Sequence, residues 1–301
     1  MSTQLDYLKK YQEEQENKNK QSENSKEEFE KKKAEREKQI VKFVLPDKGS
    51  VSAMIRFIAP ATEENMMYEY ARHNIEIGDK NHFYFCPRVD GKLCPICDKE
   101  NGNPPLITKF YADDIDFYYK TKLKTTFTWL VYVKSVGVSF DGKIDSKKKA
   151  EITDANESMI GSVRYLTVTK DLNEIIIKTA VGNAGMKITP IPIESYEKGC
   201  DFMISAKKED VLINGEKRPV TKMTISKEVV SSLSKEEILK INSYPRLSPK
   251  SFMEADRKQV TYEKMKEEVL TLYTEYKNAK NGISNPIVAS VTQTGTSLDN
   301  Y

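Results

Sequence analysis

The chain has 301 residues, of which 38% are hydrophobic and 31% charged, so it can form one large domain or two modest ones. Its net charge is only +3, so any nucleic-acid site must be a local patch, because the overall composition does not indicate one. No apolar run approaches the roughly 18 residues of a membrane helix, and the N-terminus lacks an apolar signal run. We therefore expect a soluble protein in a reducing compartment, without a membrane span.

The first 40 residues contain ten Lys or Arg and ten Asp or Glu, with few apolar side chains. This pattern predicts that residues 1–45 form a charged arm, either a fraying helix or disordered, that does not join the core. Such a segment is available for contact with a partner, including another copy of the chain. The alternative is a solubilising tail without a partner.

Two strand-like runs follow at residues 41–45 and 52–58. The second places Arg56 among apolar neighbours, which makes this residue a candidate for contact with a phosphate group. We expect the core of the protein to begin here and to extend over residues 46–281.

A compact group of potential metal ligands comes next: His73, twelve residues, Cys86, seven residues, then Cys94-Pro95-Ile96-Cys97. A Cys-x-x-Cys pair on a tight turn brings two thiolates to one ion, and Cys86 supplies a third. Either His73 or His82 satisfies the spacing for the fourth ligand. Four protein ligands predict one structural Zn²⁺, in a subdomain of about residues 70–110.

The spacing of these cysteines also allows other roles. Cys94 and Cys97 can form a redox pair, although no alternation of strands and helices surrounds them. Cys86 can be a plain buried thiol, and Cys200, far along the chain from the cluster, is expected to be one.

Residues 118–134 combine four lysines and five aromatic side chains without an acid. Read as one strand, the segment has two faces. One carries Lys120, Lys122, Lys124, Tyr132 and Lys134; the other carries Leu123, Phe127, Trp129, Val131 and Val133. Lysines beside aromatic platforms are typical of a groove for single-stranded nucleic acid. Strict alternation also fits a solvated lysine face over a core that contains Trp129, unless a bulge turns Phe127 or Trp129 outward.

The remaining pattern predicts a mainly β core with flanking helices. Further strand-like runs cover 125–138, 163–169, 174–178, 202–206 and 220–225, with turn signals at Asp90-Gly91, Asp141-Gly142 and Asn214-Gly215. Residues 147–149, three lysines, resemble a mobile loop. Helices are expected at 235–241, after a cap at Ser234, and at 262–277, within a helical region of about 234–280. Residues 282–301 predict a flexible tail. Many short strands suggest a sandwich or a small barrel.

Three segments together resemble the helix-destabilising single-stranded DNA-binding proteins of T-even bacteriophages. Residues 52–60, Ser-Ala-Met-Ile-Arg-Phe-Ile-Ala-Pro, are similar to the family's Val-Ile-Arg-Phe-Leu-Pro strand. The zinc loop is similar in its spacing and in its Cys-Pro-x-Cys ending. Residues 122–127, Lys-Leu-Lys-Thr-Thr-Phe, are similar to the family's Lys-Arg-Lys-Thr-Ser-Tyr. The resemblance covers scattered patches between residues 48 and 230.

The resemblance implies an α+β protein with an oligonucleotide-binding (OB-fold-like) barrel and an inserted zinc subdomain. It favours His73 over His82, and so implies the ligand set His73, Cys86, Cys94 and Cys97. It places Lys122, Lys124 and Phe127 in a DNA groove. It implies a non-enzymatic protein that coats single-stranded DNA during phage replication, recombination and repair, in the cytoplasm of the infected bacterial host. Self-association along the strand and contacts with phage replication proteins would accompany that role.

The chain also departs from this family. The family's basic Lys-Arg-Lys-Ser-Thr motif near the N-terminus is reduced to Ser2-Thr3-Gln4-Leu5, with Lys9 and Lys10 behind it. The family's acidic tail is missing, since Asp299 is the only acidic side chain in the last twenty residues. Two rival interpretations remain: a zinc-containing nuclease or replication accessory subunit, and a structural virion protein with a zinc knuckle.

Overall fold

The computed structural model describes residues 27–28, 30–62, 65–77, 80–99, 102–182, 189–213, 216–255 and 260–282, without the side chains of residues 213, 216 and 218. The first 26 residues of the predicted arm, the Asn214-Gly215 turn and residues 283–301 of the predicted tail lie outside these ranges. No helix in the described ranges combines the length and the apolar character needed to cross a bilayer.

The fold is α+β and is built on a seven-stranded sheet, as the strand-rich pattern with flanking helices predicts. The strands are β1 (Gly49–Phe57), β2 (Met67–Ile77), β3 (Lys80–Phe85), β4 (Leu123–Phe140), β5 (Val163–Thr169), β6 (Cys200–Ile213) and β7 (Glu216–Val230). All neighbouring strands pair antiparallel, in the order β3-β2-β4-β1-β6-β7, and β5 pairs with β4. The sheet is not closed, so the expected OB-fold barrel is not confirmed.

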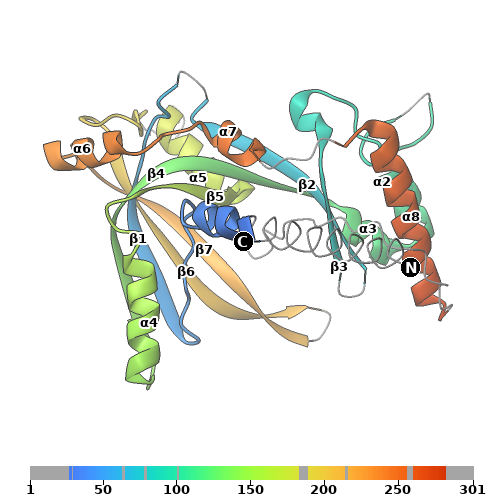
Figure 1. The fold of residues 1–301 in the computed structure, drawn as a ribbon, viewed down its shortest axis with the longest axis horizontal. Coiled ribbons are helices and arrows are strands. Elements are labelled where there is room, and N and C mark those ends of the chain that lie inside the picture. Colours follow the sequence, from blue (N-terminus) through green and yellow to red (C-terminus); the bar gives the residue numbers. More distant parts are fainter. Residues whose placement is uncertain are drawn as a thin grey trace, which may run out of the picture.

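Strand β4 connects the two ends of the molecule. Its first residues, 123–129, pair with β2, and residues 131–140 pair with β1. Figure 1 shows β2 and β3 at one end, close to helices α2 (Leu106–Asp113), α3 (Ile115–Thr121) and α8 (Tyr262–Lys280). The other end carries β1, β6, α4 (Ser146–Glu157) and α6 (Lys235–Ser243). The segment that contains His73 and the cysteines 86–97 therefore lies at one end of the fold, together with α8.

The two predicted C-terminal helices form, and local chemistry explains where they start. Ser234 and Glu237 make a reciprocal capping box at the start of α6, which satisfies backbone N–H groups that have no partner within the helix. Thr261 caps α8, which buries Met265, Val269, Leu272 and Tyr273 along one face. A short helix, α7 (Pro249–Glu254), uses Pro249 at its first position, where the missing N–H costs nothing.

Several predicted elements were wrong. Residues 174–178 lie in helix α5 (Lys170–Val181), because Leu172, Ile176 and Thr179 recur at helical spacing and are buried. Residues 118–121 belong to helix α3, and the three lysines at 147–149 open helix α4, capped by Asp145. Residues 41–45 form no strand, and strands β2 and β3 were missed. β2 carries Arg72 and His73 at its centre, so its alternation does not look hydrophobic.

The predicted arm of residues 1–45 also ends too late. Ile40 forms a parallel bridge with Tyr165 of β5, and both Ile40 and Val41 are buried. The guanidinium of Arg36 lies 4.7 Å from the centre of the Phe252 ring and donates to the Phe252 carbonyl at 2.8 Å. The end of the arm is therefore anchored on the core.

Three apolar clusters stabilise the fold. The first lies between β1, β4 and β6 on one side and α5 on the other, and includes Phe57, Trp129 and Phe202. The second lies among β2, β3, α2, α3 and α8 and includes Cys86, Cys94 and Phe117. The third covers the opposite face of β4 and includes Tyr132, Tyr165 and Phe252. The middle of β4, residues 127–133, is consequently buried on both faces.

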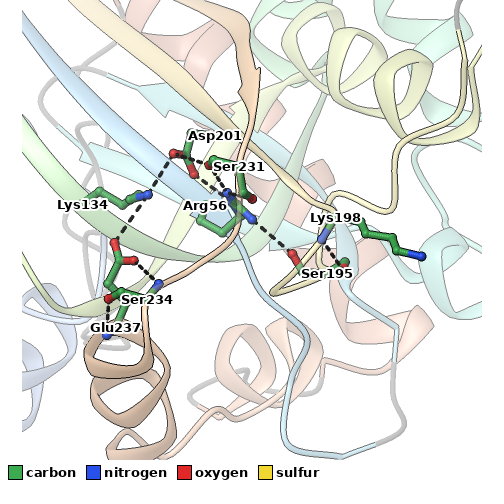
Figure 2. Close-up of polar contacts among 8 residues, drawn as sticks. All are labelled: Arg56, Lys134, Ser195, Lys198, Asp201, Ser231, Ser234 and Glu237. Atoms are coloured by element: carbon green, nitrogen blue, oxygen red, sulfur yellow. Dashed lines mark hydrogen bonds and ion pairs between the residues drawn. The ribbon is translucent and has the colours of Figure 1, made fainter.

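Arg56 is fully buried and forms a polar network instead of contacting solvent (Figure 2). Its Nε donates to Asp201 at 2.8 Å, and its terminal nitrogens donate to the Ser195 carbonyl and to both oxygens of Ser231. Lys134 pairs with the other oxygen of Asp201 at 2.9 Å and with Glu237 at 3.4 Å. The predicted contact of Arg56 with phosphate is therefore wrong, and the network joins β1, β4, β6 and α6.

We predict that Arg56→Met lowers the free energy of unfolding by about 3–5 kcal/mol, because it leaves the buried Asp201 without its main partner. The double variant Arg56→Met/Asp201→Leu should recover much of that loss, since a buried pair can be replaced by apolar groups at little net cost. Denaturant unfolding monitored by circular dichroism measures both. A single variant within about 0.5 kcal/mol of wild type would contradict this account of the network.

Candidate metal centre and basic–aromatic face

One group of potential metal ligands occurs among the described residues: His73, Cys86, Cys94 and Cys97. Their ligand atoms all lie within 4.8 Å of one another. Nε2 of His73 is 3.5 Å from Sγ of Cys94 and 3.3 Å from Sγ of Cys97. Bond lengths of about 2.3 Å to sulfur and 2.0–2.1 Å to nitrogen require S···N separations of roughly 3.6 Å around a tetrahedral ion. These two S···N distances are close to that value, so the four side chains could hold one metal ion.

Each ligand is held by the local backbone. His73 lies in the middle of β2, and Cys86 directly follows β3, where its N–H donates to the Ala71 carbonyl at 2.8 Å. The Cys94–Cys97 turn is closed by Asp98, whose carboxylate accepts from the Cys94 N–H at 2.8 Å. The Asp98 N–H returns a bond to the Cys94 carbonyl at 2.9 Å. Two strands and one turn thus converge on one point.

The positions of His73 and His82 show which of the two belongs to the group of potential ligands. His73 is fully buried in the cluster, whereas His82 lies outside it on β3. Cys200 is buried, is not part of the group, and has a raised pKa because of its burial. The ligand set that the resemblance implies is therefore the one that the structure brings together, and Cys200 is an ordinary core thiol.

The ligands perturb one another strongly. Burial disfavours a charged His73, but its hydrogen bonds to the thiols of Cys86 and Cys94 outweigh this and raise its pKa to about 9. Hydrogen bonds with Cys94 and Cys97 lower the pKa of Cys86, and hydrogen bonds with Cys86 and Cys94 raise the pKa of Cys97. A metal ion at this site would displace the protons that His73 and Cys97 hold.

Four of the eight predicted DNA-binding residues are buried: Arg56, Phe127, Trp129 and Tyr132. Phe127 and Trp129 belong to the first apolar cluster, and Trp129 donates its indole N–H to Asn173 at 2.8 Å. Tyr132 belongs to the third cluster, and Arg56 and Lys134 belong to the network around Asp201. The predicted groove is therefore wrong for Phe127, Trp129 and Tyr132, because β4 is buried on both faces there. Arg56 is buried in its own network on β1, and the half-buried Lys134 is already paired with Asp201 and Glu237.

The three other predicted lysines differ from these residues in their exposure to solvent. Lys120 is half-buried in α3, whereas Lys122 and Lys124 are exposed at the start of β4. Within the described part of the chain, neither Lys122 nor Lys124 forms an ion pair. Two of the eight predicted DNA-binding side chains therefore remain as exposed cations.

Lys124 belongs to a surface that the sequence pattern did not reveal. Arg72 lies opposite Lys124 of β4 on one side and opposite Phe85 of β3 on the other. Alternation along the strands places Tyr70 and Phe83 on the same side. The Arg72 guanidinium lies 5.0 Å from the centre of the Phe83 ring, and Tyr70 packs edge-on against Phe85 at 5.0 Å. We call Tyr70, Arg72, Phe83, Phe85 and Lys124 the basic–aromatic face.

The basic–aromatic face is partly accessible. Its aromatic rings and Arg72 are half-buried, and Lys124 is exposed. The faint sequence signal for it was the spacing of Tyr70, Arg72 and then Phe83 and Phe85 at intervals of two. Such spacing is typical of one side of a strand, but the charged and polar residues between them obscured it.

Comparison with protein-family models and with curated proteins finds no match to this chain.

We predict that the purified protein contains one equivalent of tightly bound metal and, from its donor set, that the metal is Zn²⁺. Cys94→Ser should lose the metal and lower the thermal stability, because binding to a buried four-ligand site is coupled to folding. Cys200→Ser, the matched control, should keep a full equivalent. Elemental analysis combined with thermal unfolding decides the question, and a Cys94→Ser protein that keeps its metal and its stability would contradict the assignment.

Proposed function

We propose that the protein binds single-stranded DNA through the basic–aromatic face, next to a structural zinc ion. The observation that carries this proposal is the arrangement of Arg72 and Lys124 beside Tyr70, Phe83 and Phe85 on neighbouring strands. Cations track a phosphate backbone, and aromatic rings stack on bases of any sequence, so this combination suits binding without sequence preference. The bases of a duplex are already stacked and paired, so such a face favours single strands.

The zinc ion has a supporting role in this proposal. Three thiolates and one imidazole form a donor set that proteins use for structural zinc, and four protein ligands leave no coordination position for a substrate. The ion would therefore stabilise the fold around β2 and β3 without taking part in a reaction. This supports a binding protein over a zinc-containing nuclease, the rival interpretation.

The wider role follows the resemblance stated above. We infer a protein of phage type that coats transient single strands in replication, recombination and repair within an infected bacterial cell. In this role its open antiparallel sheet would correspond to the OB-like part of the family. Neighbouring copies would meet along the strand through the charged arm, whose first 26 residues lie outside the described ranges.

We predict that affinity for single-stranded oligonucleotides falls with salt concentration and exceeds the affinity for duplex DNA. Lys124→Gln should weaken binding and make the salt slope shallower by about 0.7, the value for one phosphate contact on a single strand. Phe85→Ala should cost about 1–3 kcal/mol of binding free energy if the ring stacks on a base. Fluorescence anisotropy at several salt concentrations measures each effect.

The matched control is Lys178→Gln, because Lys178 is an exposed lysine on α5, at the opposite face of the sheet. Its affinity and salt slope should equal those of wild type. Equal losses in the Lys124 and Lys178 variants would indicate general charge attraction, and folded Lys124 and Phe85 variants with unchanged affinity would remove the face from the proposal.

A further inference from the structure

We propose that the helix formed by residues 30–37 of the charged arm borders the basic–aromatic face, and that Lys33 on this helix contacts the phosphate backbone of a bound single strand. The contact with DNA rests on the proposed function. The placement of the helix beside the face rests on the register of the sheet and on the contacts that anchor the arm.

The basic–aromatic face and the third apolar cluster lie on the same side of the sheet. Arg72 of β2 pairs with Lys124 of β4, and Tyr70 pairs with Thr126. Side chains two residues apart on a strand share one side. Leu130, which belongs to the third cluster, is therefore on the same side of β4 as Lys124. The face thus continues along β4 toward the third cluster.

Helix α7 and the arm helix cover the third cluster up to the border of the face. Tyr68 of β2 donates to Glu254 of α7 at 2.8 Å. The Arg36 guanidinium lies over the ring of Phe252 in α7, and Figure 1 shows the arm helix, in blue, below α7. Burial lowers the pKa of Arg36, and electrostatic interaction with Tyr70 opposes this shift. The anchored end of the arm therefore also lies close to the face.

Short hydroxyl side chains lie between Lys124 and the covered cluster. Thr126 is opposite Thr169 of β5, and in the next row the hydroxyl groups of Thr128 and Thr167 are 3.3 Å apart. Thr126 and Thr167 are half-buried, and Thr169 is exposed. This part of the surface is therefore uncharged and accessible, and its side chains are too short to block a strand that lies across it.

The arm helix turns two cations toward the protein. Lys33, Arg36 and Glu37 are half-buried, whereas residues 31–32 and 34–35 are exposed. Residues three and four apart share one side of a helix, so Lys33 lies one turn before Arg36 on the packed side. Within the described part of the chain Lys33 forms no ion pair, and none joins it to Glu37. A cation held against the protein in this way attracts an anion from outside the chain.

The proposed site then has cations at both borders. Arg72 and Lys124 lie at one border and Lys33 at the other, with aromatic rings and threonines between them. Cations that follow a backbone beside stacking platforms are what a site for single strands requires. The arm helix therefore adds to the affinity of a single molecule for a short strand, apart from any contact between neighbouring copies.

The first test compares two adjacent lysines of the arm helix in the full-length protein. Lys33→Gln should weaken binding to a short single-stranded oligonucleotide and make the salt slope shallower by about 0.7, the value for one phosphate contact on a single strand. Lys32→Gln removes the same charge from the exposed side of the helix and should match wild type. Circular dichroism checks that both variants fold. Equal affinities and equal slopes of the two variants would overturn the proposal.

A second measurement needs no substitution. Acetylation of the wild-type protein, followed by mass spectrometry, should slow at Lys33 and Lys124 when the oligonucleotide is bound and stay unchanged at Lys32 and Lys178. Protection of Lys124 without protection of Lys33 would reject the contact with the arm and leave the proposed function intact. Wild-type protein that binds no single-stranded DNA would reject the proposed function and this contact with it.

Discussion

The convergence of His73, Cys86, Cys94 and Cys97 on one point is the constraint on which this end of the molecule depends. β2 and β3 form a hairpin that pairs with the rest of the sheet only through the first residues of β4. A two-stranded hairpin has little stability of its own. Its buried side needs a cover, and the turn of residues 94–97 together with α2, α3 and α8 provides it. The four potential ligands come together where the hairpin meets this cover.

Strand β4 connects the end that contains these four side chains to the rest of the fold. Its first residues pair with β2 beside the group of His73 and the three cysteines, its middle is enclosed by two apolar clusters, and its second half pairs with β1. Lys134, just beyond the enclosed stretch, enters the ion-pair network that Arg56 and Asp201 form with α6. One strand thus passes from an exposed cation, Lys124, through the core to a buried polar network. Through β4 the basic–aromatic face is connected to the buried core.

Much of the metal site could be predicted from the sequence, because its ligands lie within 25 consecutive residues and thiolate chemistry restricts their spacing. The face beside it could not be predicted, since it depends on the register of three strands. That register places Arg72 between Phe85 and Lys124. The role of Arg56 could not be predicted from the sequence either. A cation in an apolar strand suggested a ligand contact, but its partner, Asp201, is 145 residues away and becomes visible only in the folded chain.

The predicted groove along β4 was wrong for a related reason. Alternation of residues 118–134 assumes a strand with one wet and one dry side, yet α3 ends at Thr121 and residues 127–133 are buried on both sides. Trp129 and Tyr132 point into different clusters. The segment begins at the end of the molecule that carries the basic–aromatic face. The exposed cations are confined to its beginning, and the accessible aromatic rings come from β2 and β3.

The central claim is that this metal-supported face contacts single-stranded DNA, and photochemical cross-linking tests it most directly. The metal-loaded protein would be irradiated with a short single-stranded oligonucleotide, and the cross-linked peptides identified by mass spectrometry. Cross-links at Tyr70, Phe83 or Phe85, lost on competition with excess unlabelled single strands but not with duplex, are the predicted result. Cross-links confined to other surfaces, such as the lysine-rich start of α4, would contradict the account.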